Sequence, residues 1–79
     1  PELYAALTAV AAAVRTGTPH RVAEEAALDR LVAAGFRPDY VAVRREHDLS
    51  EPSADAGEVR RVLAAAWLGA ARLIDNLRI

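Results

Sequence analysis

The 79-residue sequence contains no cysteine, no lysine and no methionine. Without cysteine the chain cannot form a disulfide, use a thiolate nucleophile or hold zinc through sulfur. Without lysine it cannot form a Schiff base or place a Walker-type lysine on a phosphate. Aromatic residues are also scarce, with one Trp, two Tyr and one Phe. We therefore expect a thin, closely packed core in which alanine replaces larger side chains.

The charges are nearly balanced, because ten arginines face eleven acidic residues and the net charge is −1. Such a balance offers no general attraction to nucleic acid or to an anionic membrane surface. No apolar run approaches the length of about 20 residues that a membrane span needs, and the N-terminus lacks the basic region of a signal peptide. We expect one domain over residues 1–79, located in the cytoplasm. The missing initiator methionine suggests a piece of a longer protein.

The first half of the chain predicts two helices. Residues 2–15 carry an apolar stripe at spacings of three and four, which ends before Gly17. This stripe consists of Leu3, Leu7, Val10 and Val14. A second helix is expected over residues 19–34, with Thr18 as its N-cap and Gly35 in the left-handed conformation that ends many helices. The inward residues expected on it are Val22, Ala26, Leu28 or Asp29, Leu31 and Val32.

After Gly35 the pattern changes to one of strand and loop. Residues 40–44 alternate, so that Val41 and Val43 face one side and the intervening residues face the other. Asp39 is expected to shape a turn after Pro38. Residues 45–57 are polar and rich in turn formers, which indicates a surface loop with Leu49 as its apolar anchor.

Two structures remain open for residues 58–79. The apolar positions recur at helical spacing, which on periodicity alone predicts one long helix. They are Val59, Val62, Leu63, Ala66, Trp67, Ala70, Leu73, Ile74 and Leu77. Gly69 opposes this helix, because an interior glycine costs about 1 kcal/mol and more naturally marks a turn. The alternative is a hairpin with strands at 60–68 and 71–79. An outward-facing Trp67 in that hairpin would mark a surface covered by a missing domain or a second copy.

Two stretches resemble the C-terminal domain of the pantothenate synthetase family, also called pantoate beta-alanine ligases. One is AGFRPDYVAVRREHDL, with its Asp39, Tyr40, Val43 and Arg44 in a D-Y-x-x-V-R strand. The other is VRRVLAAAWLGAARLIDNLRI, whose L-A-A-A-x-L-G-x-x-R-L-I-D-N block spans residues 63–76. The second block is long and ordered, and the two stretches cover about half of the chain.

The resemblance implies an α+β lid, in which two N-terminal helices pack on a three-stranded antiparallel sheet that ends in a C-terminal hairpin. It favours the hairpin over the long helix. It also implies an enzyme that uses ATP with Mg²⁺ to form a pantoyl adenylate, which beta-alanine attacks to give pantothenate, AMP and pyrophosphate. The family's nucleotide-binding motifs lie in an N-terminal domain and have no counterpart here. The fragment alone is expected to be inactive, to hold no catalytic residue or metal and to bind no cofactor.

Three residues of the second block are candidates for a contact with ligand or with the N-terminal domain: Arg72, Asp75 and Asn76. An arginine there could neutralise charge on a transferred phosphate. The structural alternative, which we favour, pairs Arg72 with Asp75 or another acid and uses Asn76 to satisfy backbone groups at the sheet edge. His20 and His47 have no partners at metal-ligand spacing and are expected to be solvated.

The adjacent arginine pairs at 44–45 and 60–61 could serve phosphate, but acidic residues lie close in sequence and favour a solvated charged rim. A function from another class is a stand-alone, non-catalytic homodimeric interaction module. In its all-helical form it would bury the apolar stripe of residues 59–77 against a second copy.

Overall fold

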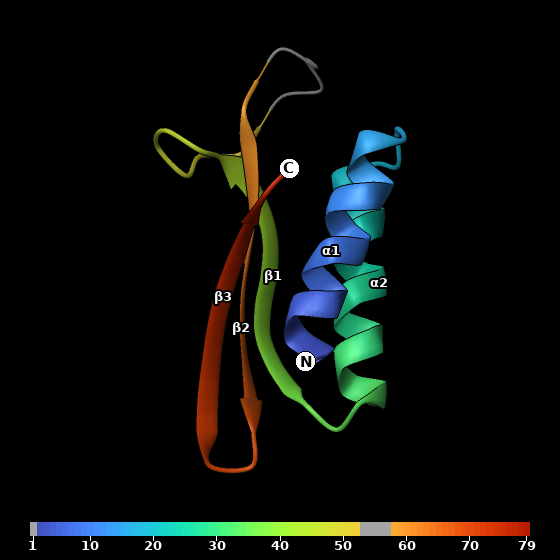
Figure 1. Ribbon diagram of the computed structural model, residues 1–79, viewed down its shortest axis with the longest axis vertical. Helices are drawn as coiled ribbons and strands as arrows, with labels where there is room; N and C mark the ends of the chain where they lie inside the picture. Colours follow the sequence, from blue (N-terminus) through green and yellow to red (C-terminus); the bar gives the residue numbers. More distant parts are fainter. Residues whose placement is uncertain (1, 53–57) are drawn as a thin grey trace.

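The computed structural model describes residues 2–52 and 58–79 and has two helices packed on one face of a three-stranded antiparallel sheet (Figure 1). In chain order the elements are α1 (Glu2–Arg15), α2 (His20–Ala33), β1 (Arg37–Arg45), β2 (Arg60–Leu68) and β3 (Ala71–Arg78). The sheet order is β1-β2-β3. The predicted α+β fold is confirmed, including the C-terminal hairpin. None of the described helices is long and apolar enough to cross a bilayer.

Helix α1 buries the predicted stripe. Leu3, Leu7, Val10 and Val14 are at most 5% exposed, and Ala6 and Ala11 are fully buried beside them. The helix ends at Arg15, and Gly17 follows with a φ of 96°, in the left-handed region that glycine adopts without a steric penalty.

Helix α2 buries Leu31 as expected, but the rest of its inner row differs from the expected one. Its buried residues are Ala23, Ala27 and Leu31, which follow one another at a spacing of four, whereas Val22 and Val32 are 55% and 60% exposed. Apolar residues occur on both sides of this helix, so periodicity alone could not identify the inner one. Small alanines on the inner row let α2 lie close to the rest of the core.

The ends of α2 also correct one expectation and confirm another. The residue that precedes the helix is Pro19, no side chain caps its first turn, and Thr18 is therefore not the N-cap. Gly35 has the predicted left-handed conformation, with a φ of 93°. Glu24 accepts a hydrogen bond of 2.7 Å from the backbone N–H of Val43 in β1, which ties α2 to this edge of the sheet.

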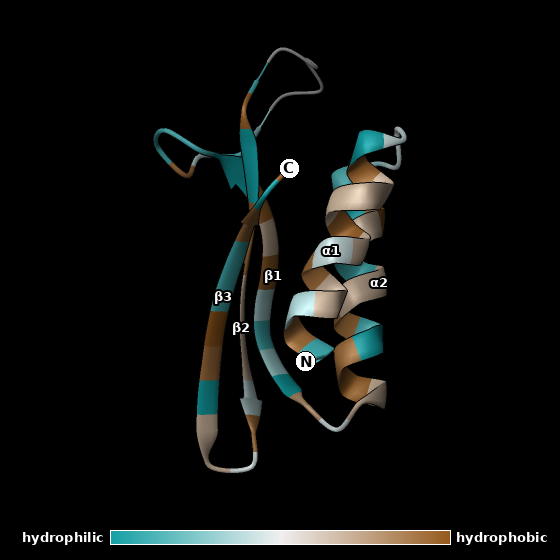
Figure 2. Cartoon of the chain, in the orientation of Figure 1, coloured by the Kyte–Doolittle hydropathy of each residue, from teal (hydrophilic) through white to brown (hydrophobic). Residues whose placement is uncertain are grey.

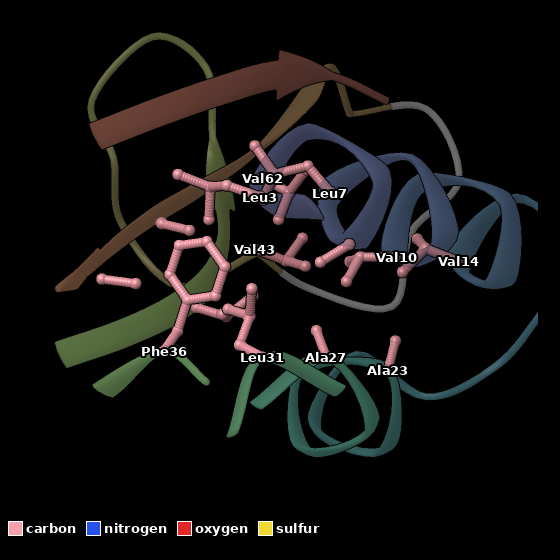
Figure 3. Packing of buried hydrophobic residues seen from close by; sticks show 14 residues of the cluster. Leu3, Leu7, Val10, Val14, Ala23, Ala27, Leu31, Phe36, Val43 and Val62 are labelled. Atoms are coloured by element: carbon pink, nitrogen blue, oxygen red, sulfur yellow. The ribbon is translucent and has the colours of Figure 1, made fainter. Parts of the chain in front are cut away.

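The hairpin turns at Gly69, which has a φ of 61°. Strand β2 sends Val62, Ala64 and Ala66 toward the helices, and all three are fully buried. In the close-up of Figure 3, side chains from both helices, β1 and β2 point toward one another in a single cluster. Tertiary burial of the small β2 residues against α1 outweighs the helical spacing of residues 59–77.

Strand β1 is longer than predicted, and a register shift between Pro38 and Tyr40 marks a β-bulge at Asp39. The bulge adds one residue, so Asp39 and Tyr40 can both lie on the side of the sheet away from the helices. Asp39 therefore belongs to the strand, and the predicted turn at this position is wrong. Val41 and Val43 face the helices as expected, with 6% and 0% exposure.

The loop after β1 begins with a turn in which Leu49 is 52% exposed and has a φ of 59°. Leu49 is therefore not the predicted apolar anchor. The rest of the expected loop, residues 53–57, lies outside the described residues.

Candidate functional site

One face of the sheet carries α1 and α2, and no described element covers the other, which we call the helix-free face (Figure 1). Hydrophilic and hydrophobic residues alternate in bands along β3, which is the edge strand of the sheet opposite β1 (Figure 2). The register aligns cross-strand rows from β1 through β2 to β3. The side chains of the helix-free face are Arg37, Asp39, Tyr40, Ala42, Arg44, Arg61, Leu63, Ala65, Trp67, Arg72, Ile74, Asn76 and Arg78.

The centre of this face is an apolar row. Tyr40, Ala65 and Ile74 lie opposite one another across the three strands. Tyr40 is 41% exposed and Ile74 is 65% exposed, whereas Ala65 has no exposed surface because the larger neighbours flank it. Exposed apolar surface of this kind at the middle of an uncovered sheet is typical of a binding surface.

At the hairpin end, Arg37, Trp67 and Arg72 form the next aligned row. The Arg37 guanidinium lies 5.6 Å from the centroid of the Trp67 ring, which is within the range of a cation–π contact. Arg72 donates from Nε to Oδ2 of Asp39 at 2.8 Å, and both side chains are about two-fifths exposed. The bulge makes this pair possible, because it brings Asp39 to the helix-free face.

At the opposite end, Glu46 joins two strands. Its carboxylate accepts from Arg61 at 2.9 Å and from Arg78 at 2.7 and 2.8 Å. These hydrogen bonds lower the pKa of Glu46, with Arg78 as the largest contributor and Arg61 as the next, and Glu46 in turn raises the pKa of Arg78. Arg44 pairs with Glu51 at 3.0 Å beside them. This end is therefore an ion-pair network on an exposed surface.

The three candidate residues of the second block do not converge on one point. Arg72 pairs with Asp39 rather than with Asp75, which agrees with the structural alternative of a pair with another acid. Asn76 lies four residues along β3, about 13 Å from Arg72 at the usual rise per residue, and accepts from Arg61 at 2.6 Å. Asp75 points to the opposite side of the strand and accepts from the backbone N–H of Asn76 at 2.8 Å. The backbone partner at the sheet edge is thus Asp75, not Asn76 as predicted.

His20 is not simply solvated. Its Nε2 lies 2.9 Å from Nη1 of Arg60, and Nε of Arg60 is buried without a partner among the described residues. His47 is 79% exposed and lies 3.4 Å from Asp48. Within residues 2–52 and 58–79, no group of three or more His, Cys, Asp or Glu could hold a metal ion.

The arginine pairs separate according to the strand alternation. Arg44 and Arg61 lie on the helix-free face, whereas Arg45 bonds to Glu58 and Arg60 to His20. Arg37 was not among the predicted site residues, because it is brought to Trp67, 30 positions along the chain, only by the β1–β2 register.

The described residues also line two hollows away from the apolar row of the helix-free face. One, of about 280 Å³, is lined by Arg45, Glu46, His47, Glu58 and Val59. The other, of about 200 Å³, lies between the helices and is lined mainly by alanines. Neither lining contains a serine, threonine or cysteine that could act as a nucleophile.

The chain matches proteins of one family along its length. The family model of pantoate-beta-alanine ligase matches residues 1–78. The pantothenate synthetase of Thioalkalivibrio sulfidiphilus is 49% identical over 80 residues, which cover 100% of this chain and 28% of that protein. The pantothenate synthetase of Shewanella baltica is 45% identical over 78 residues, with 99% and 27% covered.

A solved structure agrees with these sequence matches. The crystal structure of pantothenate synthetase from Thermus thermophilus superposes with a TM-score of 0.80 and 36% identity, covering 98% of this chain and 28% of that one. The chain therefore spans little more than a quarter of the length of the relatives it matches. With a family model that matches residues 1–78 and a solved member that shares its fold, the chain belongs to the pantoate-beta-alanine ligase family.

Proposed function

We propose that this chain is the C-terminal lid domain of a pantothenate synthetase and acts together with an N-terminal nucleotide-binding domain of the same polypeptide. The proposal is carried by one observation: the match runs along the whole chain but covers only 28% of relatives named for this activity. The complete enzyme would activate pantoate with ATP as an adenylate, and the amine of beta-alanine would then displace AMP. Its location would be the cytoplasm.

The described side chains suit a supporting role in this reaction. Guanidinium groups pair well with phosphate oxygens, and the helix-free face presents several of them. The described residues offer no cluster of carboxylates for Mg²⁺. Because the family resemblance implies that the nucleotide-binding motifs lie in an N-terminal domain, metal coordination and the binding of ATP are proposed for that domain, and the segment alone is expected to be inactive.

Release of AMP in the presence of ATP, Mg²⁺, pantoate and beta-alanine tests the proposal. Three proteins are compared: the full-length enzyme, the 79-residue segment, and the enzyme truncated before residue 1. We expect turnover only from the full-length enzyme. Turnover by the segment alone would show that it is not merely a lid, and full activity of the truncated enzyme would show that no lid is needed.

A homodimeric interaction module is the second candidate, supported by the exposure of Ile74 and Tyr40 on the helix-free face. The all-helical form of this module is wrong, because residues 60–78 form a hairpin. Sedimentation of the segment over a range of concentrations separates the candidates, since a dimer that persists at micromolar concentration would favour the module.

A further inference from the structure

We infer that the helix-free face is the surface that closes over the nucleotide-binding part of the same polypeptide, and that Arg37 is its cation available for the nucleotide phosphates. This inference rests on the proposed function and adds to it the docking face and one residue. The alternative surface is the outer side of α1 and α2.

The two surfaces differ in how their apolar residues are arranged. On the helix-free face, Tyr40, Ala65 and Ile74 form one continuous row across the sheet. On the helices the exposed large apolar residues are Tyr4 of α1 and Val22 and Val32 of α2, and the two valines lie ten residues apart, so about 15 Å separates them along the helix axis. A continuous apolar centre with a charged rim is the arrangement found in protein interfaces, whereas separated apolar residues are normal on any surface.

The helix-free face is also positively charged, although the chain as a whole has a net charge of −1. Five arginines lie on it, and the carboxylates paired with them are Asp39, Glu46 and Glu51. The face therefore carries a formal charge of +2, which leaves −3 for the remainder of the chain. A cationic face complements a site that holds a nucleotide polyphosphate, and the acidic remainder does not.

Among these five arginines, Arg37 is the one with no carboxylate partner within the described residues. The Trp67 ring supports its guanidinium from one side, and this contact leaves the N–H donors free for an anion. Arg72 across the ring is already held by Asp39. Arg37 is therefore the group on this face best suited to bind phosphate oxygens on closure.

A second copy of the chain fits this face poorly. In a two-fold symmetric dimer, identical faces meet, so two surfaces of charge +2 would be brought together. The face is also narrow, because three strands of eight or nine residues project onto only about 400 Å² at the usual strand spacing and rise. A lid joined to its partner through the same chain needs less area, because the covalent link raises the effective concentration.

The test uses the full-length enzyme and two matched pairs of variants. Ile74→Asp places a charge in the apolar row of the helix-free face, and Val32→Asp makes the same change at a similarly exposed position on α2. Arg37→Gln removes the free cation, and Arg21→Gln removes an exposed arginine of α2 that has no described partner. We expect Ile74→Asp and Arg37→Gln each to lower kcat/KM for ATP by about tenfold or more, with both controls within about twofold of wild type.

Additional variants distinguish docking from folding. Ile74→Thr retains the strand preference of a β-branched residue but removes apolar surface, so it should give a smaller loss at an unchanged unfolding temperature. Arg37→Lys should restore part of the loss, because it returns the charge without the planar guanidinium.

Other results would overturn the inference. If the wild-type enzyme releases AMP but Ile74→Asp and Arg37→Gln match their controls, the face is wrongly assigned and the lid function stands. A larger loss in Val32→Asp would assign docking to the helices. If Ile74→Asp converts a dimeric enzyme to monomers without changing KM for ATP, the occupant is a second copy. An inactive wild-type enzyme would instead refute the proposed function itself.

Discussion

The ion pair between Arg72 and Asp39 allows the most specific test of the hairpin register and of the bulge in β1. The two groups come from strands that are not neighbours, and they meet at 2.8 Å only because the bulge brings Asp39 to the helix-free face. Arg72 is separated from Asp75 by only three positions, and the sequence offers Asp75 as an equally reasonable partner. A double-mutant cycle can distinguish the two acids.

The size of the coupling follows from the exposure of the pair. Two unit charges about 4 Å apart attract by about 1 kcal/mol in water and by about 4 kcal/mol at the effective dielectric constant near a protein surface. Both side chains are 39% exposed, so solvent screening and the entropy of ordering reduce this attraction. We expect a coupling of about 0.5–1 kcal/mol between Arg72 and Asp39, and a coupling near zero between Arg72 and Asp75.

The coupling between Arg72 and Asp39 is obtained from urea unfolding of four proteins: the wild type, Arg72→Gln, Asp39→Asn and the double variant. The control cycle replaces Asp39→Asn by Asp75→Asn and gives the coupling between Arg72 and Asp75. Added NaCl at about 0.5 M should reduce the coupling to Asp39, because it screens exposed charges. A coupling to Asp75 larger than that to Asp39 would contradict the register of β2 with β3 or the bulge at Asp39.

Three further predictions concern stability. Leu7→Ala, at a fully buried position of α1, should lower the free energy of unfolding by about 3 kcal/mol in urea titration, and a change below about 1 kcal/mol would argue against the core assigned here. Gly69→Ala should lower the free energy of unfolding by about 1 kcal/mol, because the turn requires a φ of 61° that alanine adopts only with strain. Thermal unfolding measures this loss against the control Ala70→Ser, and an equal unfolding temperature for the two variants would place the turn elsewhere. The depressed pKa of Glu46 means that its ion pairs stabilise the fold above the ordinary value of 4.5, and that this contribution is lost as the pH falls through the folded pKa. Glu46→Gln should therefore be less stable than wild type at neutral pH and should converge with it in acid, while a constant difference down to about pH 3 would refute the role of the ion pairs.

The helices and strands were largely predictable because their signals are local. Gly17, Gly35 and Gly69 all adopt the left-handed conformation at the ends or turns where the sequence suggested them. The last 22 residues were ambiguous from periodicity alone. Several of them are alanines, which can be buried in either a helix or a strand, so the larger apolar residues at helical spacing do not exclude a pair of strands. The family resemblance gave the correct hairpin.

The pairing of side chains could not be predicted, because it depends on strand register. Asp39 pairs with Arg72 only through a bulge, and no residue in the sequence signals the bulge clearly. Arg37 meets Trp67 and Arg60 meets His20 through contacts between distant segments. The buried side of α2 is likewise determined by the elements packed against it. Val22 and Val32, which were expected to be buried, are therefore exposed.

We propose that this chain is a lid which completes an enzyme whose catalytic residues lie elsewhere in the polypeptide. This proposal is tested most directly by adding the 79-residue chain in increasing amounts to the enzyme truncated before residue 1 and measuring AMP release. We expect AMP release to rise from background and to saturate as the chain is added. No gain at any concentration of the folded chain, as judged by circular dichroism, would contradict it.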